Sequence, residues 1–385
     1  MRQLTIVHLQ SYFQPHLGYQ EYFLCKSMAK AGHNVHIITS DRYASFLDLE
    51  KGRIVGCGET TMDGFYIHRL PIYFEIRGRV LIKKVFSKIN ELNPDILILH
   101  GSTNFSNILP LLLRKRLKSK IIIDEHHIRL IENKSTLSRI FYGIWGIWYR
   151  KLILKKEVFL VGVADACCKF LSEKYQIPLP MINLISLGAD IDLFKPDSEK
   201  RRQIRKRLKI QSNEVLIIYT GKINFEKDPF ILLKACQEVP MNNKLKFIFI
   251  GDKSNDYIKK YKEFIDFDNV IIFSAIQNRE LPKYYAAADI ACWPKHTSLS
   301  SLEAASCALP IIISNNVKER VSHQNGIAIE EENIIDIKKA ILKLSNNKKL
   351  RKTMGESGRS FINQKYSYDL ISKQFIDLAF KQGGH

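Results

Sequence analysis

The sequence lacks the patterns of several common protein classes. Its seven cysteines are odd in number, scattered and free of any C-x-x-C pair, so neither a disulfide framework nor a zinc site is indicated. The longest apolar stretch without a charge, Ile140 to Tyr149, is ten residues long. That is about half the length of a membrane-spanning helix. The first apolar run is too short for a signal peptide, and we expect a cytoplasmic protein.

What is present is typical of a globular protein with more than one core. The chain has 385 residues, of which 45% are hydrophobic and 25% charged. This length suits two domains of about 150 to 200 residues each. Lys and Arg number 59 against 39 Asp and Glu, a formal net charge of +20. Such a charge favours three kinds of polyanionic partner: nucleic acid, an anionic membrane, or phosphorylated small molecules.

Short apolar runs alternate with helical segments in two series. Because these runs are rich in Ile, Val and Leu throughout, they predict parallel strands that are covered on both faces, and hence two doubly wound sheets. Apolar periodicity lapses between 187 and 208, where we place a domain boundary near 190 to 200. Ligands of such sheets bind beyond the carboxyl ends of the strands. The runs are 4–9, 35–39, 96–99, 121–123, 159–163, 215–219, 247–250, 270–273, 290–293 and 311–313.

Two segments of the first series end in residues that suggest a ligand. Gly18 precedes a helix that runs to about Ala31, where a glycine lets the backbone approach a ligand; a plain turn glycine is the alternative. No G-x-G-x-x-G pattern follows, which disfavours a dinucleotide cofactor. The strand 121–123 is followed by Asp124, Glu125, His126 and His127, polar residues that need hydrogen bonds or a ligand when buried. A hydrogen-bonded core histidine remains the alternative.

The second series places two cations after its first strand. Lys222 and Lys227 follow Gly221 in the loop that leads to the next helix. Cations in this position neutralise a diphosphate as it leaves, although solvated surface lysines would give the same pattern. The sequence contains no Walker A motif.

A loop of small hydroxyl residues follows the strand 290–293. It leads to a helix that begins near Ser300 and has Glu303 in its first turn. Glu303 either caps this helix or accepts both hydroxyls of a ribose, while the loop N–H groups hold a phosphate.

Several segments in this order resemble the GT-B glycosyltransferases of the large retaining family 4, which includes sucrose synthases and bacterial mannosyl- and glucosyltransferases. The resemblance covers nearly the whole chain. It implies an α/β fold of two Rossmann-like domains facing across a cleft, residues 1–190 for the acceptor and 191–365 for the nucleotide-sugar donor, with 366–385 as a crossover helix and tail. The segments are AGHNVHIITS, IIIDEHH, ISLGADIDLFKP, YTGKINFEK, FIFIGD, ELPKYYAAADIACWP, SSLEAASCALPIII, NGIAI and MGESGR.

The resemblance assigns roles within the first domain. Gly18 would face the donor diphosphate and the reacting sugar. His126, which ends a D-x-H stretch, corresponds to the family's histidine beside the donor sugar and would position that sugar. Asp124 is a further candidate for contact with the sugar.

The resemblance also assigns the donor site in the second domain. Lys222 and Lys227 match the family's cations on the diphosphate. Glu303 matches the second glutamate of the E-x7-E motif, which is expected on the ribose. Ser298 and Leu299 match loop positions whose N–H groups approach the phosphate.

This chain departs from the family pattern at one place. The first glutamate of E-x7-E falls at Lys295, and the loop before Glu303 is shortened. That acid usually meets the donor sugar, so the identity of the sugar is open. The hydroxyls of Thr297 and Ser298 are candidates to replace it.

The resemblance implies a retaining hexosyltransferase that needs no metal and no cofactor beyond a UDP- or GDP-sugar co-substrate. The two D-x-D strings, Asp190 to Asp192 and Asp266 to Asp268, do not follow strand ends and are interpreted as loop or linker. A nucleotide-sugar epimerase or a phosphorylase of similar fold is the first alternative. A nucleic-acid-binding protein is the second, and no helix-turn-helix, zinc finger or RNP pattern supports it.

Basic residues and aromatic residues alternate between 139 and 156. Phe141, Trp145, Trp148 and Tyr149 lie there among lysines and arginines, a composition suited to an anionic membrane surface. A buried aromatic helix with a solvated basic end is the alternative. We expect a saccharide or polyprenyl-linked acceptor, a role in cell-surface polysaccharide or glycoconjugate synthesis, and association with the inner face of the membrane.

Overall fold

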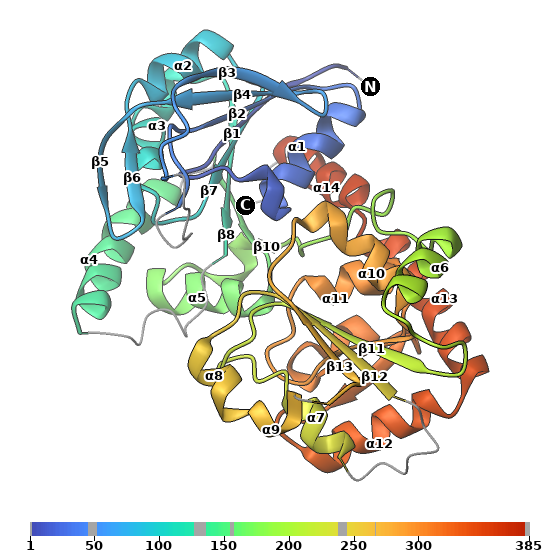
Figure 1. Ribbon diagram of the computed structural model, residues 1–385. Coiled ribbons are helices and arrows are strands. Elements are labelled where there is room, and N and C mark those ends of the chain that lie inside the picture. Colours follow the sequence, from blue (N-terminus) through green and yellow to red (C-terminus); the bar gives the residue numbers. More distant parts are fainter. Residues whose placement is uncertain are drawn as a thin grey trace. The chain divides into compact units, whose positions relative to one another are not determined.

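The computed structural model describes residues 2–44, 52–126, 136–154, 158–237, 245–265 and 267–381, and it consists of two compact units (Figure 1). Unit 1 contains Met1–Leu187 together with Tyr368–His385, and unit 2 contains Gly188–Ser367. The chain therefore leaves unit 1 once and returns to it with its last helix.

Unit 1 is built on an eight-stranded sheet with the order β10-β9-β8-β7-β1-β2-β4-β3. All neighbouring strands are parallel except β3, which lies antiparallel to β4 at the edge. A separate antiparallel hairpin is formed by β5 and β6. The strands are β1 (Thr5–Leu9), β2 (Asn34–Ser40), β3 (Gly58–Met62), β4 (Phe65–Leu70), β5 (Ile72–Ile76), β6 (Arg79–Ile82), β7 (Ile96–His100), β8 (Lys120–Glu125), β9 (Val158–Gly162) and β10 (Ile182–Leu184).

Helices flank this sheet, and the last helix of the chain packs on the first (Figure 1). The rings of Phe23 and Tyr368 stack 5.0 Å apart, and the Ser27 hydroxyl donates to Asp369 at 2.9 Å. The predicted return of the C-terminal helix to the first domain is thus confirmed. The helices are α1 (Gln20–Lys30), α2 (Val85–Leu92), α3 (Ile108–Leu112), α4 (Thr136–Ile153), α5 (Asp165–Tyr175) and α14 (Tyr368–Phe380).

Unit 2 has a six-stranded, fully parallel sheet with the order β13-β12-β11-β14-β15-β16. The strands are β11 (Val215–Thr220), β12 (Leu245–Ile250), β13 (Val270–Phe273), β14 (Ile290–Trp293), β15 (Ile311–Ser314) and β16 (Gly326–Ile329). The helices are α6 (Ser198–Arg207), α7 (Ile231–Cys236), α8 (Asn255–Lys260), α9 (Lys262–Ile265), α10 (Leu281–Ala287), α11 (Ser300–Ser306), α12 (Ile334–Ser345) and α13 (Lys348–Lys365).

The strand order marks where each unit binds a ligand. In unit 1 the order reverses between β1 and β7, and in unit 2 it reverses between β11 and β14. Connections from two such strands leave in opposite directions, which opens a crevice at their carboxyl ends. The loops after β1, β7 and β8 and those after β11 and β14 are therefore the places to examine. Among the described helices, none is long and apolar enough to cross a membrane.

Candidate functional site

Three strands of unit 1 bring a chain of histidines onto one buried carboxylate. His8 of β1 lies with its Nδ1 3.0 Å from Nε2 of His100, the last residue of β7. Nδ1 of His100 lies 2.9 Å from Oδ2 of Asp124 on β8, and Nε2 of His126 lies 3.2 Å from the same oxygen. The two residues predicted here, Asp124 and His126, thus belong to a larger hydrogen-bonded set.

The charges of this set follow from burial and proximity. Burial raises the pKa of Asp124, but attraction and hydrogen bonds from His100 and His126 outweigh it and hold that pKa well below its usual range. Burial likewise opposes charge on His126, yet Asp124 prevails and raises the pKa of His126 to about 9. Burial, followed by the neighbouring His100, lowers the pKa of His8. At neutral pH, Asp124 is therefore an anion, His126 a cation and His8 neutral.

The same cluster has the spacing of a cation site. One ligand atom from each of His100, Asp124 and His126 lies within 4.8 Å of the others. Those atoms are already hydrogen-bonded to one another, so a bound ion would have to replace these bonds. His100 belongs to a different strand from Asp124 and His126, so the spacing of residues along the chain does not reveal this cluster.

Several buried polar atoms without partners lie after the strands that carry this cluster. Within the described residues, the side-chain amide of Gln20, Nε2 of Gln14, Nδ2 of Asn104 and Oδ1 of Asp124 make no hydrogen bond. These residues belong to the loop after β1, the start of α1, the loop after β7 and the end of β8. An unpaired buried polar group costs about 1–3 kcal/mol, so a polar ligand that pairs with these groups would recover this cost.

Gly18 lies in the turn between β1 and α1. Its φ is 66°, a left-handed conformation that favours glycine, and its N–H donates to the carbonyl of Pro15. The residue is buried. The turn itself accounts for the glycine, and its predicted place beside a diphosphate stays a prediction.

Unit 2 carries its two candidate cations directly after β11. Lys227 is half-buried, and its Nζ donates to the backbone carbonyl of His296 at 3.3 Å, which joins the β11 and β14 loops. Burial lowers the pKa of Lys227, the charge of Glu226 opposes this shift, and the charge of Lys222 adds to it. Lys222 is exposed. The pair therefore consists of one anchored amine and one free in solvent.

The β11 loop also depends on a close backbone contact. A Cβ on Gly251, at the end of β12, would lie 1.8 Å from the carbonyl oxygen of Gly221. Only glycine fits there, so the first residue after β11 keeps its position next to β12.

The loop after β14 is fixed by side chains from unit 2. Arg320 donates to the carbonyl of Ser298 and to the hydroxyl of Ser301, both at 2.9 Å. The hydroxyl of Thr297 accepts from the N–H of Ser314 at 3.1 Å. In the described chain, the N–H groups of Ser298 and Leu299 have no hydrogen-bond partner. They are therefore available to an anion, and their predicted contact with a phosphate stays a prediction.

Two acids from a distant segment hold the start of this loop. Lys295, which stands where the family has that glutamate, pairs with Glu332. The N–H of His296 donates to Glu331 at 3.0 Å. Both acids precede α12, far along the chain, so the start of the shortened loop is held by charges from a distant segment.

Glu303 lies buried in the first turn of α11, with 3% of its surface exposed. Nδ2 of Asn278 donates to its Oε1 at 2.8 Å. Burial raises the pKa of Glu303 to about 7, although hydrogen bonds from Asn278 and Tyr285 oppose the shift. The carboxyl group changes its protonation near neutral pH.

The tryptophans of the basic helix α4 pack against the core, and isoleucines lie exposed on the same helix. Trp145 donates its Nε1 to the carbonyl of Ser102, and both Trp145 and Trp148 pack partly buried against the core with Tyr149. The exposed apolar side chains of this helix are Ile140, Ile144 and Ile147. The side chain of Phe141 and residues 155–156 lie outside the described residues.

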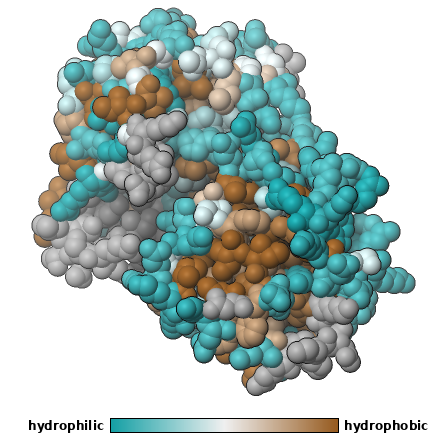
Figure 2. All heavy atoms as spheres, viewed as in Figure 1, coloured by the Kyte–Doolittle hydropathy of each residue, from teal (hydrophilic) through white to brown (hydrophobic). Residues whose placement is uncertain are grey.

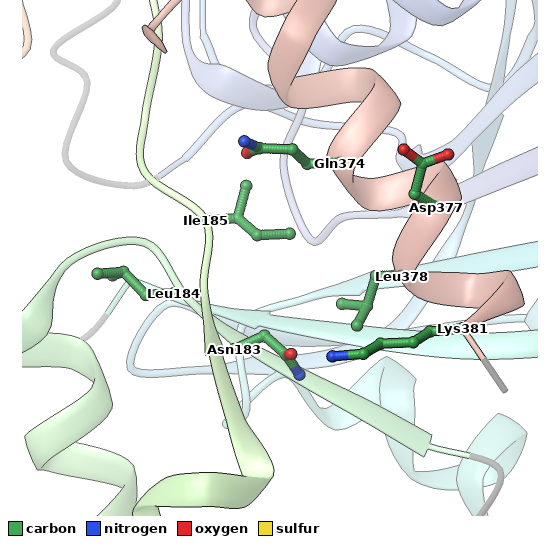
Figure 3. Close-up of a pocket in the computed structure, with 7 residues that line it drawn as sticks. All are labelled: Asn183, Leu184, Ile185, Gln374, Asp377, Leu378 and Lys381. Atoms are coloured by element: carbon green, nitrogen blue, oxygen red, sulfur yellow. The ribbon is translucent and has the colours of Figure 1, made fainter. Parts of the chain in front are cut away.

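The remaining predictions concern the two D-x-D strings and His127. Oδ1 of Asp190 accepts the N–H groups of Asp192 and Leu193, as expected for a linker turn. His127 and Asp266 lie outside the described residues. A pocket of about 390 Å³ lies in unit 1, and none of the predicted site residues lines it. Its lining residues come from the segment at β10 and from α14 and the residue after it (Figure 3): Asn183, Leu184, Ile185, Gln374, Asp377, Leu378 and Lys381.

Sequence reasoning missed four side chains that hold these clusters together: His8, His100, Asn278 and Arg320. His100 carried a signal, because it ends an apolar strand just as Asp124 does. No sequence signal marked Asn278 or Arg320, because each lies far along the chain from the residue that it contacts in the folded protein.

Comparisons with known proteins find glycosyltransferases for both units. The family model of the glycosyl transferases group 1 matches residues 200–361, and that of glycosyltransferase family 4 matches residues 21–193. An uncharacterized glycosyltransferase of Methanocaldococcus jannaschii is 22% identical over 97% of this chain and 98% of its own length. A GDP-mannose-dependent phosphatidylinositol monomannoside mannosyltransferase of Mycobacterium tuberculosis is 20% identical over 52% of this chain and 56% of its own.

Solved structures share the fold from end to end. HepE of Anabaena, in complex with UDP and glucose, has a TM-score of 0.73 at 15% identity, with 99% of this chain and 100% of that chain covered. Sucrose-phosphate synthase of Thermosynechococcus elongatus has a TM-score of 0.72 at 16% identity and 98% coverage of both chains.

Proposed function

Because this chain belongs to the GT-B glycosyltransferases of the family 4 type, we propose that it moves a sugar, with retention, from a nucleotide diphosphate to a saccharide or lipid-linked saccharide. Glycosyl transfer is common to the group. The donor, the acceptor, the stereochemistry and a role in cell-surface polysaccharide or glycoconjugate synthesis are parts of the proposal.

The observation that carries the donor assignment is the anchored amine at the switch point of unit 2. Lys227 reaches across to the β14 loop at His296, and the same loop offers the unpaired N–H groups of Ser298 and Leu299. A charged amine and backbone donors on two neighbouring loops suit a diphosphate, and the exposed Lys222 adds a second positive charge. The UDP bound to HepE and the GDP-mannose dependence of the mycobacterial relative support a UDP- or GDP-sugar.

Glu303 is the candidate for the ribose of the donor. Its carboxyl group is buried at the start of α11, and Asn278 already occupies one of its oxygens. The second oxygen would accept a ribose hydroxyl.

In the proposed reaction, the bond between the anomeric carbon and the diphosphate oxygen breaks while the acceptor oxygen bonds to the same carbon. The acceptor proton passes to the departing diphosphate. Positive charge grows on the sugar and negative charge on the leaving group, and Lys222, Lys227 and the loop N–H groups stabilise the latter. No nucleophile is evident at a matching position, so we propose displacement on one face of the sugar without a covalent intermediate and without a metal.

Unit 1 is proposed to hold the sugar and the acceptor. Its unpaired amides, Gln14 and Gln20 among them, match the hydroxyl groups of a saccharide, which both donate and accept hydrogen bonds. His126, beside Asp124, would position the donor sugar.

Exposed apolar side chains on unit 1 support a membrane-bound acceptor (Figure 2). The hairpin β5–β6 exposes Tyr73, Phe74 and Ile76. The rings of Phe74 and Phe105 lie 6.0 Å apart, and those of Phe105 and Trp145 lie 5.8 Å apart, which connects the hairpin to α4 and its exposed isoleucines. With nearby basic residues, these surfaces suit the inner face of an anionic membrane. Flotation with anionic liposomes tests this part of the proposal.

A binding panel tests the donor assignment. UDP-, GDP-, TDP- and ADP-sugars are titrated by calorimetry against the wild type, Lys227→Ala, Glu303→Ala and the matched surface control Lys259→Ala. We expect one base to bind, both site variants to bind it more weakly and the control to equal the wild type. If no nucleotide sugar binds, or if Lys227→Ala binds as tightly as the wild type, the proposal fails.

A further inference from the structure

The hydrogen bonds of the unit 1 cluster have a direction. A carboxylate only accepts hydrogen bonds, so His100 Nδ1 and His126 Nε2 both carry protons toward Asp124. The arrangement with the fewest buried charges then has His8 Nδ1 donating to His100 Nε2. A proton is thus donated at each step from His8 through His100 to Asp124, and from the other side by His126.

This arrangement leaves one ring atom of His126 for a ligand. Its backbone N–H donates to Glu125 at 2.9 Å and its Nε2 donates to Asp124, while its Nδ1 has no partner within the described chain. The side chain is 37% exposed, whereas Asp124 and His100 are buried. The buried partners fix one side of the ring, and the other side faces accessible space.

We propose that His100, supported by His8, is a positioning residue that holds Asp124 so that the Nδ1 side of the His126 ring faces the donor substrate. This inference rests on the proposed function, because it assigns the donor sugar or its diphosphate as the ligand. His100 touches no ligand itself. Without it, the buried Asp124 would lose one of the two hydrogen bonds on Oδ2 and would no longer fix the ring of His126.

A second histidine pair in the same sheet provides a matched control. His36 Nδ1 lies 3.0 Å from His68 Nε2, and their rings stack 5.2 Å apart. These values equal the 3.0 Å and 5.2 Å of the pair His8 and His100. His36 and His68 contact neither Asp124 nor His126, so a variant here reports the cost of losing a buried histidine pair alone.

The test compares His100→Leu, His100→Asn and His36→Leu. Leucine removes the donor, whereas the amide nitrogen of asparagine takes the place of Nδ1. We expect His100→Leu to lower kcat about 10- to 100-fold with little change in KM, as for other outer partners of an active-site group. His100→Asn should recover most of this loss, and His36→Leu should keep the wild-type kcat. Equal kcat in His100→Leu and the wild type would overturn the proposal, as would equal losses in the leucine and asparagine variants.

Two further measurements keep this test decisive. Thermal unfolding checks whether His100→Leu is folded. If it is not, His8→Leu is used in its place, and we expect a smaller loss of kcat. Side-chain ¹⁵N NMR follows His126 without any turnover: the wild type should show Nε2 protonated and hydrogen-bonded, and His100→Leu should not. If the wild type transfers no sugar from any donor, the proposed function fails, and the NMR comparison alone decides whether His100 fixes His126.

Discussion

Replacing Lys227 by alanine removes the one anchored cation of the proposed diphosphate site. The amine is half-buried and bonds to the carbonyl of His296, so its position is fixed before any ligand arrives. Lys222, five residues earlier, is exposed and has no such anchor. We therefore expect the variant at 227 to lose far more than the variant at 222.

The magnitude follows from the charge and its fixed position. A hydrogen bond to a charged group contributes about 1.5–3 kcal/mol, which corresponds to a loss of about 10- to 150-fold in affinity for the nucleoside diphosphate. The transition state carries more charge on the leaving group, so kcat should fall by about 10²- to 10³-fold. Stability should change by less than about 1 kcal/mol, because the side chain of Lys227 makes one hydrogen bond within the described chain.

The assay measures binding of UDP and GDP by calorimetry and transfer from the matching sugar, with Lys259→Ala as the surface control. Burial lowers the pKa of Lys227, so the charged amine is lost, and binding weakens, as the pH rises through a range below that of an ordinary lysine. Lys227→Arg should shift this loss to higher pH. The reasoning is refuted if Lys222→Ala and Lys227→Ala weaken binding equally, or if neither does.

Three further predictions concern both units. Gln20→Met should raise the melting temperature and raise the KM of a sugar substrate, since it removes a buried amide without partners that is free to bind hydroxyls; a lower melting temperature would contradict this. For Glu303, whose raised pKa of about 7 favours the folded state at low pH, stability should fall by about 3 kcal/mol between pH 4.5 and 7, and Glu303→Gln should abolish this slope in urea unfolding. Ile144→Asp with Ile147→Asp should reduce flotation with anionic liposomes and leave nucleotide binding intact; unchanged flotation would exclude α4 from the membrane surface.

Most of the sheet is predictable because its strands are buried on both faces. All ten apolar runs of the sequence form strands, since parallel strands covered by helices are apolar at nearly every position. The strands that sequence reasoning missed are those without such a run. In β3, Gly58–Met62, every residue is exposed, and in β5 most residues lie at the surface. β3 forms by pairing with β4, and β5 forms by pairing with β6. The amino-acid composition of a strand does not reveal which strand it pairs with.

Sequence reasoning reached candidate site residues most directly where they lie at a strand end, as Asp124 and His126 do at the end of β8. Lys227 and Glu303 were proposed from their positions in the loop after β11 and in the first turn of α11. The bonds of Lys227 to His296 and of His8 to His100 join residues 69 and 92 positions apart. Such contacts depend on which strands become neighbours, and the order β8-β7-β1 is a property of the folded sheet.

The departure at Lys295 shows how a lost motif residue can be compensated. Lysine at this position forms an ion pair with Glu332, so the pair adds no net charge to the loop. Glu332 neutralises Lys295, and Glu331 holds the next residue, His296, whose carbonyl anchors Lys227. The acids before α12 thus hold the loop after β14, and the carbonyl of His296 in this loop anchors Lys227. Within the described residues of unit 1, the buried amide of Gln20 without partners has the chemistry that a sugar hydroxyl requires, and we propose it as one such contact.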